Sequence, residues 1–315
     1  MSPTLARIQQ AAERIRPYAH RTPVVTCENL DRKAGARIFL KCENLQKTGS
    51  FKFRGACNAV FSLSEQDAAR GVVTYSSGNH AQAVALAARL RGIPASIVMH
   101  NNAPQVKKAA VEGYGGQVTS CEPNQESRVA VQSEIIARTG SLPIHPYDNE
   151  LVIAGQATAA FELLQDVPDL DVIMTPVGGG GLLSGTTLAA REHSRPVRVI
   201  AAEPEEADDA FRSLAAGTIL PSVNPRTIAD GLLTSLGQLT FPIIRHGVER
   251  IITVSEAEII EAMHFVWERT KLIIEPSAAV PVAALWNGKA DLSGLRIGVI
   301  LSGGNVDLGR LPWQK

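Results

Sequence analysis

The sequence contains few cysteines, no excess of either charge and no long apolar run. Its 315 residues include four cysteines, Cys27, Cys42, Cys57 and Cys121, and none of them forms a Cys-x-x-Cys pair. Neither zinc-ligand spacing nor a dense disulfide framework is therefore present. Lysine plus arginine and aspartate plus glutamate number 31 each. This balance argues against a basic surface built for nucleic acid or for an anionic membrane.

Targeting and membrane segments are also missing from the pattern. Residues 1–20 contain no continuous apolar core of the kind found in a secretory signal. No uninterrupted apolar stretch reaches the length that a bilayer span requires. We therefore expect a cytoplasmic protein with no membrane association and no nucleic-acid partner. Hydrophobic residues make up 45% of the chain, enough for a sizeable core, and the length favours about two lobes.

Short β-branched segments alternate with longer segments of helical period. The predicted strands are residues 37–42, 71–77, 95–100, 117–121, 171–177, 197–203, 250–255 and 296–304. The segments between them have apolar positions three and four apart and often end on glycine, which is typical of helices. This alternation predicts an α/β fold with parallel sheets flanked by helices. Because no long linker separates two halves, we expect one lobe to be inserted into the other.

Three loops that follow predicted strands are rich in glycine, serine and asparagine, namely "SSGNH" (76–80), "GGGGLLSG" (178–185) and "LSGGNVD" (301–307). Ligands bind outside the carboxyl ends of strands in open sheets of this kind. The four glycines leave backbone N–H groups unobstructed at a helix start, which suits a phosphate dianion. A flexible turn is the alternative, but four consecutive glycines are costly in chain entropy. The spacing is not the G-x-G-x-x-G of a dinucleotide site.

The other two loops are open to plainer explanations. Residues 76–80 would present hydroxyl and N–H groups at a helix N-terminus, which suits a carboxylate. Helix capping accounts for the same serine and asparagine residues equally well. Ser302, at the end of the last predicted strand, is explained by a tight turn with a hydroxyl cap.

Lys52 lies between Phe51 and Phe53 in the stretch "KTGSFKFRGACNAV" (47–60). A surface helix with Lys52 on its exposed face is one interpretation. The other is a buried lysine whose pKa is lowered, so that it acts as a nucleophile or Schiff-base former. Together, a reactive lysine, a phosphate cradle, a carboxylate cradle and a hydroxyl at a strand end are what pyridoxal 5′-phosphate requires when it acts on an amino acid.

Nine collinear segments carry a resemblance to a known family. They are "KTGSFKFRG", "SSGNHAQA", "CEPNQESR", "VIAGQAT", "VGGGGLLSG", "AAEPEEADD", "IADGL", "WERTKLIIEPSAAV" and "LSGGNVDL". In this order they resemble the serine racemase and threonine/serine (3-hydroxyamino acid) dehydratase family, from Arg21 to Leu308. The resemblance implies the two-lobed, tryptophan synthase β-like fold of the pyridoxal-phosphate enzymes (fold type II). It further implies a small lobe at residues 48–146, inserted into a large lobe made of residues 1–47 and 147–315, and a homodimer.

The resemblance also implies roles for individual residues. Lys52 matches the Schiff-base lysine, and Phe51 matches the aromatic residue packed against the cofactor ring. Asn79 matches the residue hydrogen-bonded to the cofactor's 3′-oxygen. Ser302 matches the hydroxyl that faces the pyridine nitrogen. The phosphate loop corresponds to Gly178, Gly179, Gly180 and Gly181.

Substrate-binding roles are implied for Ser76, Ser77, Gly78, His80, Arg128 and Thr234. Ser77 matches the serine that faces the substrate's α-carbon opposite the lysine in racemases, although dehydratases of the family can carry it too. Arg128 matches an arginine that approaches the distal end of a dicarboxylate ligand. The alternative for Arg128 is an ordinary arginine on a helix surface.

A divalent cation site is implied by "EPEEADD". Its ligands would be Glu203, the carbonyl of Ala207 and Asp209, and hard oxygen ligands of this kind suit Mg²⁺ or Mn²⁺. An acidic, solvated helix start is the alternative explanation of this run.

The expected function is that of a dehydratase (ammonia-lyase). It would convert 3-hydroxy-L-amino acids, namely serine, threonine, threo-3-hydroxyaspartate or phenylserine, to 2-oxo acids and ammonia, with Lys52 as the general base. The alternative is a serine racemase that interconverts L- and D-serine or aspartate, with Ser77 returning the proton and elimination as a side activity. A β-replacement synthase, a nicotinamide oxidoreductase and a non-catalytic binding protein stay open as rivals.

Overall fold

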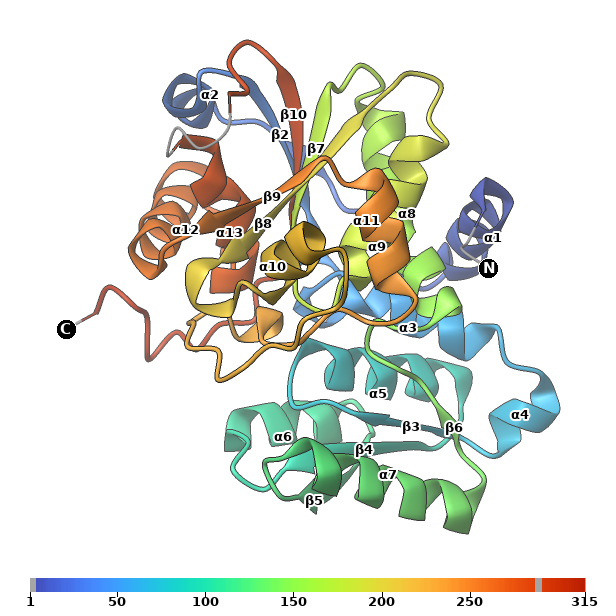
Figure 1. Ribbon diagram of the computed structural model, residues 1–315. Coiled ribbons are helices and arrows are strands. Elements are labelled where there is room, and N and C mark those ends of the chain that lie inside the picture. Colours follow the sequence, from blue (N-terminus) through green and yellow to red (C-terminus); the bar gives the residue numbers. More distant parts are fainter. Residues whose placement is uncertain (1–3, 287–290, 315) are drawn as a thin grey trace.

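Two mainly parallel sheets organise the computed structural model, which describes residues 4–286 and 291–314 (Figure 1). The larger sheet has the strand order β1-β2-β10-β7-β8-β9. Its strands are β1 (Val24–Val25), β2 (Arg37–Cys42), β7 (Val172–Pro176), β8 (Arg198–Pro204), β9 (Arg250–Val254) and β10 (Arg296–Leu301). Only β1 is antiparallel to its neighbour; the other pairs are parallel. All eight strands predicted from the sequence are confirmed.

The smaller sheet has the order β5-β4-β3-β6, and all its pairs are parallel. Its strands are β3 (Val72–Tyr75), β4 (Ala95–His100), β5 (Gln117–Cys121) and β6 (Leu142–Pro143). All four lie inside the predicted insertion, residues 48–146, whose boundaries stay a prediction. The two-residue strands β1 and β6 were not predicted, because two residues are too few to show a period.

Helices cover both faces of each sheet. They are α1 (Leu5–Ile15), α2 (Glu28–Ala34), α3 (Lys52–Phe61), α4 (Glu65–Ala69), α5 (Asn79–Arg91), α6 (Gln105–Gly113), α7 (Gln125–Thr139), α8 (Glu150–Asp166), α9 (Gly181–Arg191), α10 (Asp209–Ala216), α11 (Thr240–Gly247), α12 (Glu256–Thr270) and α13 (Pro276–Trp286). Short 3-10 turns are η1 (Glu43–Leu45), η2 (Lys47–Gly49), η3 (Glu205–Ala207) and η4 (Asp230–Leu232).

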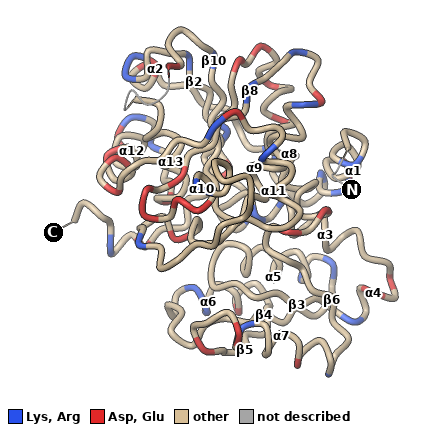
Figure 2. The backbone as a smooth tube through the Cα atoms, viewed as in Figure 1, with Lys and Arg blue, Asp and Glu red and all other residues tan. Residues whose placement is uncertain are grey.

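The core is built from these layers. Helices α2, α12 and α13 share one apolar cluster with the larger sheet, and α1, α8 and α9 share another. Helices α3, α5 and α6 pack on one face of the smaller sheet, and α7 packs on the other. Within the described part of the chain, no helix is both long and apolar enough to cross a membrane. Figure 2 shows basic and acidic residues interspersed along the backbone, with an acidic segment beside α10.

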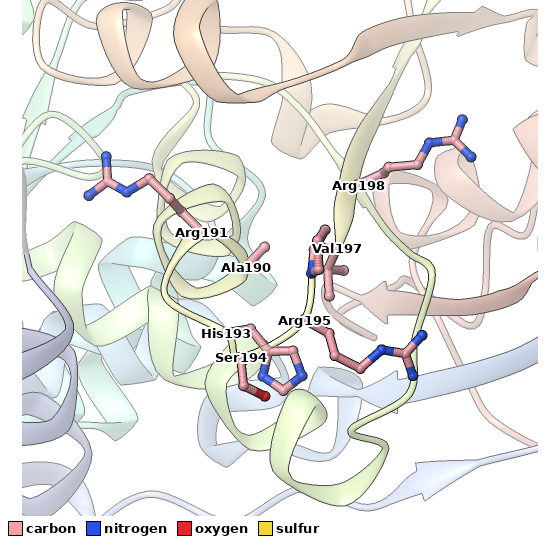
Figure 3. Close-up of a pocket in the computed structure, with 8 residues that line it drawn as sticks. Ala190, Arg191, His193, Ser194, Arg195, Val197 and Arg198 are labelled. Atoms are coloured by element: carbon pink, nitrogen blue, oxygen red, sulfur yellow. The ribbon is translucent and has the colours of Figure 1, made fainter.

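One surface hollow lies where α9 leads into β8 and is lined by residues 190, 191 and 193–198. In Figure 3, the side chains of Arg191, Arg195 and Arg198 point in different directions rather than toward one another. Arg198 is also paired with Glu249 at 2.5 Å. The hollow lies at the amino end of β8, whereas ligand-binding loops follow the carboxyl ends of parallel strands. It is therefore not the candidate active site.

A buried group of charges ties α3 to the larger sheet. Arg54 Nε donates to Glu43 Oε2 at 2.7 Å, and Arg54 Nη1 donates to Glu162 Oε1 at 2.8 Å. Lys41 Nζ donates to the other Glu162 oxygen at 2.8 Å. The side chains of Arg54, Glu43 and Lys41 are 0% exposed. Two cations therefore balance two carboxylates in the interior, and each charge is hydrogen-bonded, as burial requires.

Replacing Arg54 by methionine should lower the free energy of unfolding by about 3–5 kcal/mol, because Glu43 and Glu162 would lose their main cationic partner in the interior. Urea denaturation measures this loss. The control is Arg198→Ala, which breaks an exposed pair and should cost less than about 1 kcal/mol. A loss in Arg54→Met no larger than in the control would show that the buried network does not hold α3.

Candidate active site

Lys52 is the first residue of α3 and lies where the two lobes meet (Figure 1). Its Nζ donates to the carbonyl of Pro146 at 2.8 Å and lies 5.2 Å from the centre of the Phe51 ring. Part of the side chain stays accessible, as a reactive amine needs, but protein surrounds it closely. Burial lowers the Lys52 pKa to about 8, and the negative charge of Glu275 opposes this shift. The reactive-lysine interpretation of the sequence therefore has a physical basis.

The segment before Lys52 is fixed to the end of β10. The Phe51 N–H donates to the carbonyl of Ser302 at 3.0 Å, and Ser50 forms an antiparallel bridge with Gly303. Gly49 has a φ of +73°, and a Cβ there would lie 2.3 Å from Asn305 Oδ1. The backbone of the "KTGSFK" segment therefore packs directly on the "LSGGN" turn, which brings Lys52 and Ser302 to one place.

Asn79, at the start of α5, is oriented by two side chains from the other lobe. Its Nδ2 donates to both carboxylate oxygens of Glu275, at 3.0 and 3.1 Å. Its Oδ1 accepts from Asn305 Nδ2 at 2.9 Å. Glu275 is 4% exposed, and burial raises its pKa to about 7. Glu275 and Asn305 therefore fix the orientation of the Asn79 amide.

The glycine loop joins β7 to α9 and permits close backbone contacts. A Cβ at Gly178 would lie 2.9 Å from the Cα of Leu232, so no side chain fits there. Gly180 has a φ of +87° and caps α9 at its N-terminus. The amide of Gln156 packs on Gly181, is 0% exposed, and has no hydrogen-bond partner within the described residues. An unbonded buried amide beside a helix N-terminus fits an anion such as phosphate.

The "SSGNH" loop lies between β3 and α5. Ser77 Oγ accepts the backbone N–H of His100 at 3.2 Å, and Ser76 Oγ accepts that of Gly78 at 3.3 Å. The His80 ring is buried, and its Nε2 donates to the Ile144 carbonyl at 3.1 Å. Burial and the nearby Lys52 lower the His80 pKa to about 3, so the ring is neutral. A carboxylate at this loop would therefore meet the backbone N–H of His80 rather than its ring.

Tyr147 connects the glycine loop to Thr234. Its ring packs on Gly179, where a Cβ would lie 2.3 Å from the ring. Burial raises the Tyr147 pKa to about 12, against the opposing effect of its hydrogen bond with Thr234. The phenol therefore stays protonated. Thr234 is thereby linked to the glycine loop through Tyr147.

A family model described as pyridoxal-phosphate dependent enzyme matches residues 15–303. The chain belongs to this family. It is 49% identical over 312 residues to the β-hydroxyaspartate dehydratase of Paracoccus denitrificans, covering 99% of both chains. It is 50% identical to the serine racemase of Dictyostelium discoideum, covering 97% of this chain and 95% of the relative. The structure of maize serine racemase matches with a TM-score of 0.96 and 44% identity, covering 98% of this chain and 95% of that one.

The site of this pyridoxal-phosphate enzyme has the residues that the cofactor requires. Glu275 accepts from Asn79 and lies near Lys52, and the Phe51 N–H donates to the Ser302 carbonyl. Tyr147 packs on the glycine loop, and the preceding residue, Pro146, accepts from Lys52. The buried Gln156 amide, which has no partner within the described residues and lies beside the start of α9, fits a phosphate group there. The fold type II architecture expected from the sequence is confirmed.

The residues expected to bind a cation lie at the end of β8, in η3 and at the start of α10. Both Glu203 oxygens accept backbone N–H groups, from Ala210 at 3.0 Å and Phe211 at 2.8 Å. Neither Asp209 oxygen has a hydrogen-bond partner within the described residues. The nearby Ser222 hydroxyl lowers the Asp209 pKa, but by less than burial raises it. Burial raises the Asp209 pKa to about 6. Among described residues, no cluster of three or more metal-binding side chains occurs. Of these residues, Asp209 fits a cation best, because both of its oxygens lack a hydrogen-bond partner within the described residues.

Three site residues were not singled out from the sequence: Glu275, Gln156 and Tyr147. Glu275 and Gln156 stand in the quoted segments "WERTKLIIEPSAAV" and "VIAGQAT". A charged or amide side chain inside such apolar runs is itself a signal, because burial of a polar group is costly without a partner. Tyr147 carries no comparable signal.

The neutral form of Lys52, which is the form that reacts with an aldehyde, reaches half of the total at the pKa of about 8. Cofactor-free protein should therefore take up pyridoxal phosphate faster as pH rises, with the midpoint of the rise at about 8 rather than near the ordinary 10.5. Stopped-flow absorbance of the lysine-bound cofactor measures this rate, with Lys52→Arg as the unreactive control. A rate that still rises at about pH 10 would contradict the lowered pKa.

Proposed function

We propose that this enzyme is a dehydratase (ammonia-lyase) that converts 3-hydroxy-L-amino acids to 2-oxo acids and ammonia. The observation that carries the proposal is the Lys52 amine, which bonds the Pro146 carbonyl at 2.8 Å and whose pKa burial lowers to about 8. The 49% identity to a β-hydroxyaspartate dehydratase over nearly the whole chain supports the same reaction class.

The residues of the site would have separate roles in holding the cofactor and in removing the α-proton. Lys52 and the backbone of residues 178–181 would hold the cofactor, and Asn79 and Ser302 would face its ring. Pyridoxal phosphate, when bound, supplies an electron sink for the charge left at the substrate's α-carbon. Lys52, once released as a free amine, would take the α-proton as general base, because a pKa of about 8 leaves part of the amine unprotonated near neutral pH. Its bond to the Pro146 carbonyl fixes the direction of the amine.

The substrate's α-carboxylate is assigned to the loop from Ser76 to His80, where N–H groups and the start of α5 favour an anion. Thr234, which bonds Tyr147, is assigned to the substrate as well. Ser302 would place a hydroxyl, not a carboxylate, at the cofactor's pyridine nitrogen. A hydroxyl does not hold a proton there, so the sink is weaker and prompt loss of a β-leaving group is favoured over a long-lived carbanion.

Racemisation is the second candidate function, and Ser77 favours it. The Ser77 oxygen accepts the backbone N–H of His100, which leaves its own O–H free to donate to a substrate. Opposite Lys52, this hydroxyl would return a proton to the other face of the α-carbon and give the D-amino acid. The 50% identity to a serine racemase supports this activity beside elimination.

Purified holoenzyme should be assayed with L-serine, L-threonine, the threo and erythro 3-hydroxyaspartates and L-threo-phenylserine, with 2-oxo acid and D-amino acid followed together. We expect 2-oxo acid as the main product. In Ser77→Ala, D-amino acid formation should fall by about 100-fold or more, the usual size of a general acid's contribution, while elimination persists. Equal loss of both activities would contradict the separate role of Ser77, and no product from any substrate would overturn the proposed function.

The proposal includes a divalent cation, Mg²⁺ or Mn²⁺, held by Asp209 and Glu203 with the Ala207 carbonyl and water. The buried, unbonded oxygens of Asp209 support it, and hard carboxylate oxygens suit such ions. Its role would be structural, since its ligands come from the end of β8, η3 and α10, and none of them contacts Lys52 within the described residues. A homodimer and a cytoplasmic location are proposed from the family resemblance, and light scattering tests the first.

Mg²⁺ at about ten times its dissociation constant should stabilise the fold by about 1.4 kcal/mol and raise Tm by about 2–4 °C. The shift should vanish in Asp209→Asn, which removes the charge that the cation neutralises. Asp208→Asn is the matched control, because Asp208 is paired with Arg212 at 2.7 Å and should keep the shift. An equal shift in both variants would place the cation elsewhere.

A further inference from the structure

Helix α11 is capped by a side chain from a distant part of the chain. Its N-cap residue is Leu239, whose side chain cannot accept a hydrogen bond. The carboxylate of Asp148 accepts instead. Its Oδ2 accepts the backbone N–H of Gln238 at 3.0 Å, and its Oδ1 accepts those of Leu239 and Thr240 at 2.8 and 3.3 Å. Because Asp148 and Gln238 are 90 positions apart, this cap fastens two segments together as well as satisfying the start of a helix.

Thr240 connects this cap to the glycine loop. Its side chain is fully buried, and its Oγ1 donates to the carbonyl of Gly179 at 2.9 Å while it accepts the backbone N–H of Gly237 at 2.8 Å. Thr240 also packs on Gly180, where a Cβ would lie 2.9 Å from the Thr240 Cβ. The backbone of the glycine loop therefore depends on the position of Thr240, and the bonds to Asp148 help to set that position.

The residue before Asp148 contacts the same loop. The Tyr147 ring packs on Gly179, and the Tyr147 Cα would lie 3.1 Å from a Cβ at Gly181. This segment is itself folded by His145, whose Nδ1 accepts the backbone N–H groups of Tyr147 and Asp148 at 3.3 and 2.8 Å. Two segments therefore hold the glycine loop, one through Tyr147 and the other through the first residue of α11, and the Asp148 carboxylate joins them.

Helices α9 and α11 start next to each other, but only α11 receives an acidic cap (Figure 1). The N-cap of α9 is Gly180, which brings no capping side chain, and the first turn of α9 contains no acidic residue. Its N–H groups and dipole therefore suit an anion, whereas Asp148 occupies the corresponding groups of α11. A run of glycines is flexible, however, and several N–H groups bind one anion together only when their backbone is ordered.

We propose that Asp148 is a positioning residue for the cofactor phosphate, because its carboxylate holds Thr240, and through Thr240 the glycine loop, in the conformation that binds the anion. The inference rests on one part of the proposed function, the assignment of the phosphate to residues 178–181, and not on which amino acid reacts. Contacts that order a loop before binding remove the entropy cost of ordering it and raise the affinity. Loss of the Asp148 carboxylate should therefore weaken binding of the phosphate and leave the reactivity of Lys52 unchanged.

The test compares pyridoxal phosphate with pyridoxal, which lacks the phosphate. Absorbance of the lysine-bound form gives both dissociation constants in full-length protein freed of cofactor, with Lys52→Arg as the background from other lysines. In Asp148→Ala, the dissociation constant of pyridoxal phosphate should rise by about tenfold or more and that of pyridoxal by less than about twofold. Asp148→Asn, which keeps one carbonyl oxygen as an acceptor, should lose less. The matched control is Ser255→Ala, which removes the cap of α12 in the same lobe and should change neither constant.

Equal rises for both ligands, or no rise for pyridoxal phosphate, would overturn the proposal. A second pair of variants decides the matter if Asp148→Ala does not fold: Thr240→Val should weaken binding of pyridoxal phosphate alone, and Thr240→Ser, which keeps the hydroxyl, should not. Equal behaviour of these two variants would also overturn it. If wild type binds pyridoxal phosphate no more tightly than pyridoxal, the glycine loop does not hold the phosphate and the proposal is refuted at its premise. Neither ligand requires an amino-acid substrate, so a failure of the dehydratase function would leave these results unchanged.

Discussion

The ion pair between Arg54 and Glu43 is the constraint on which the placement of the reactive lysine depends. Arg54 lies two residues after Lys52 on α3 and is 0% exposed, as is Glu43. An unpaired buried charge is strongly destabilising. The favourable position of α3 is therefore the one that places the Arg54 guanidinium between η1 and α8. That position in turn fixes the start of the helix, and so the amine of Lys52, at the carboxyl end of the larger sheet. The polar interior here determines geometry more than it adds stability.

Around that fixed helix start, the two sheets contribute opposite halves of the site. The larger sheet supplies the turns after β7 and β10, and the smaller sheet supplies the loop after β3. Glu275 spans the two halves, since it bonds Asn79 of the smaller lobe and lies near Lys52. Its carboxylate pKa of about 7 and the amine pKa of about 8 are both results of the same burial. Perturbed groups that meet in this way are typical of catalytic sites.

The sequence predicted the features that are local, and the structure adds those that are not. Strands such as 37–42 and the glycine loop at 178–181 show in the chain itself, because period and backbone freedom are properties of neighbouring residues. Glu275 and Asn79 are 196 positions apart, and no pattern within either segment predicts their contact. The sequence predicts only that His100 ends a strand. The contact of its ring with Arg128 depends on how the strands pair.

Topology explains why Tyr75, His100 and Arg128 meet at all. Strands β3, β4 and β5 are parallel neighbours, with Tyr75 opposite Val98 and His100 opposite Cys121. Their carboxyl ends therefore lie in a row at one edge of the sheet. The chain leaves β5 at Cys121, turns back, and begins α7 at Gln125, so the first turn of that helix lies over the ends of its neighbours. Strand order therefore places Arg128 at the ends of β3 and β4, where its guanidinium contacts His100 and lies over the Tyr75 ring.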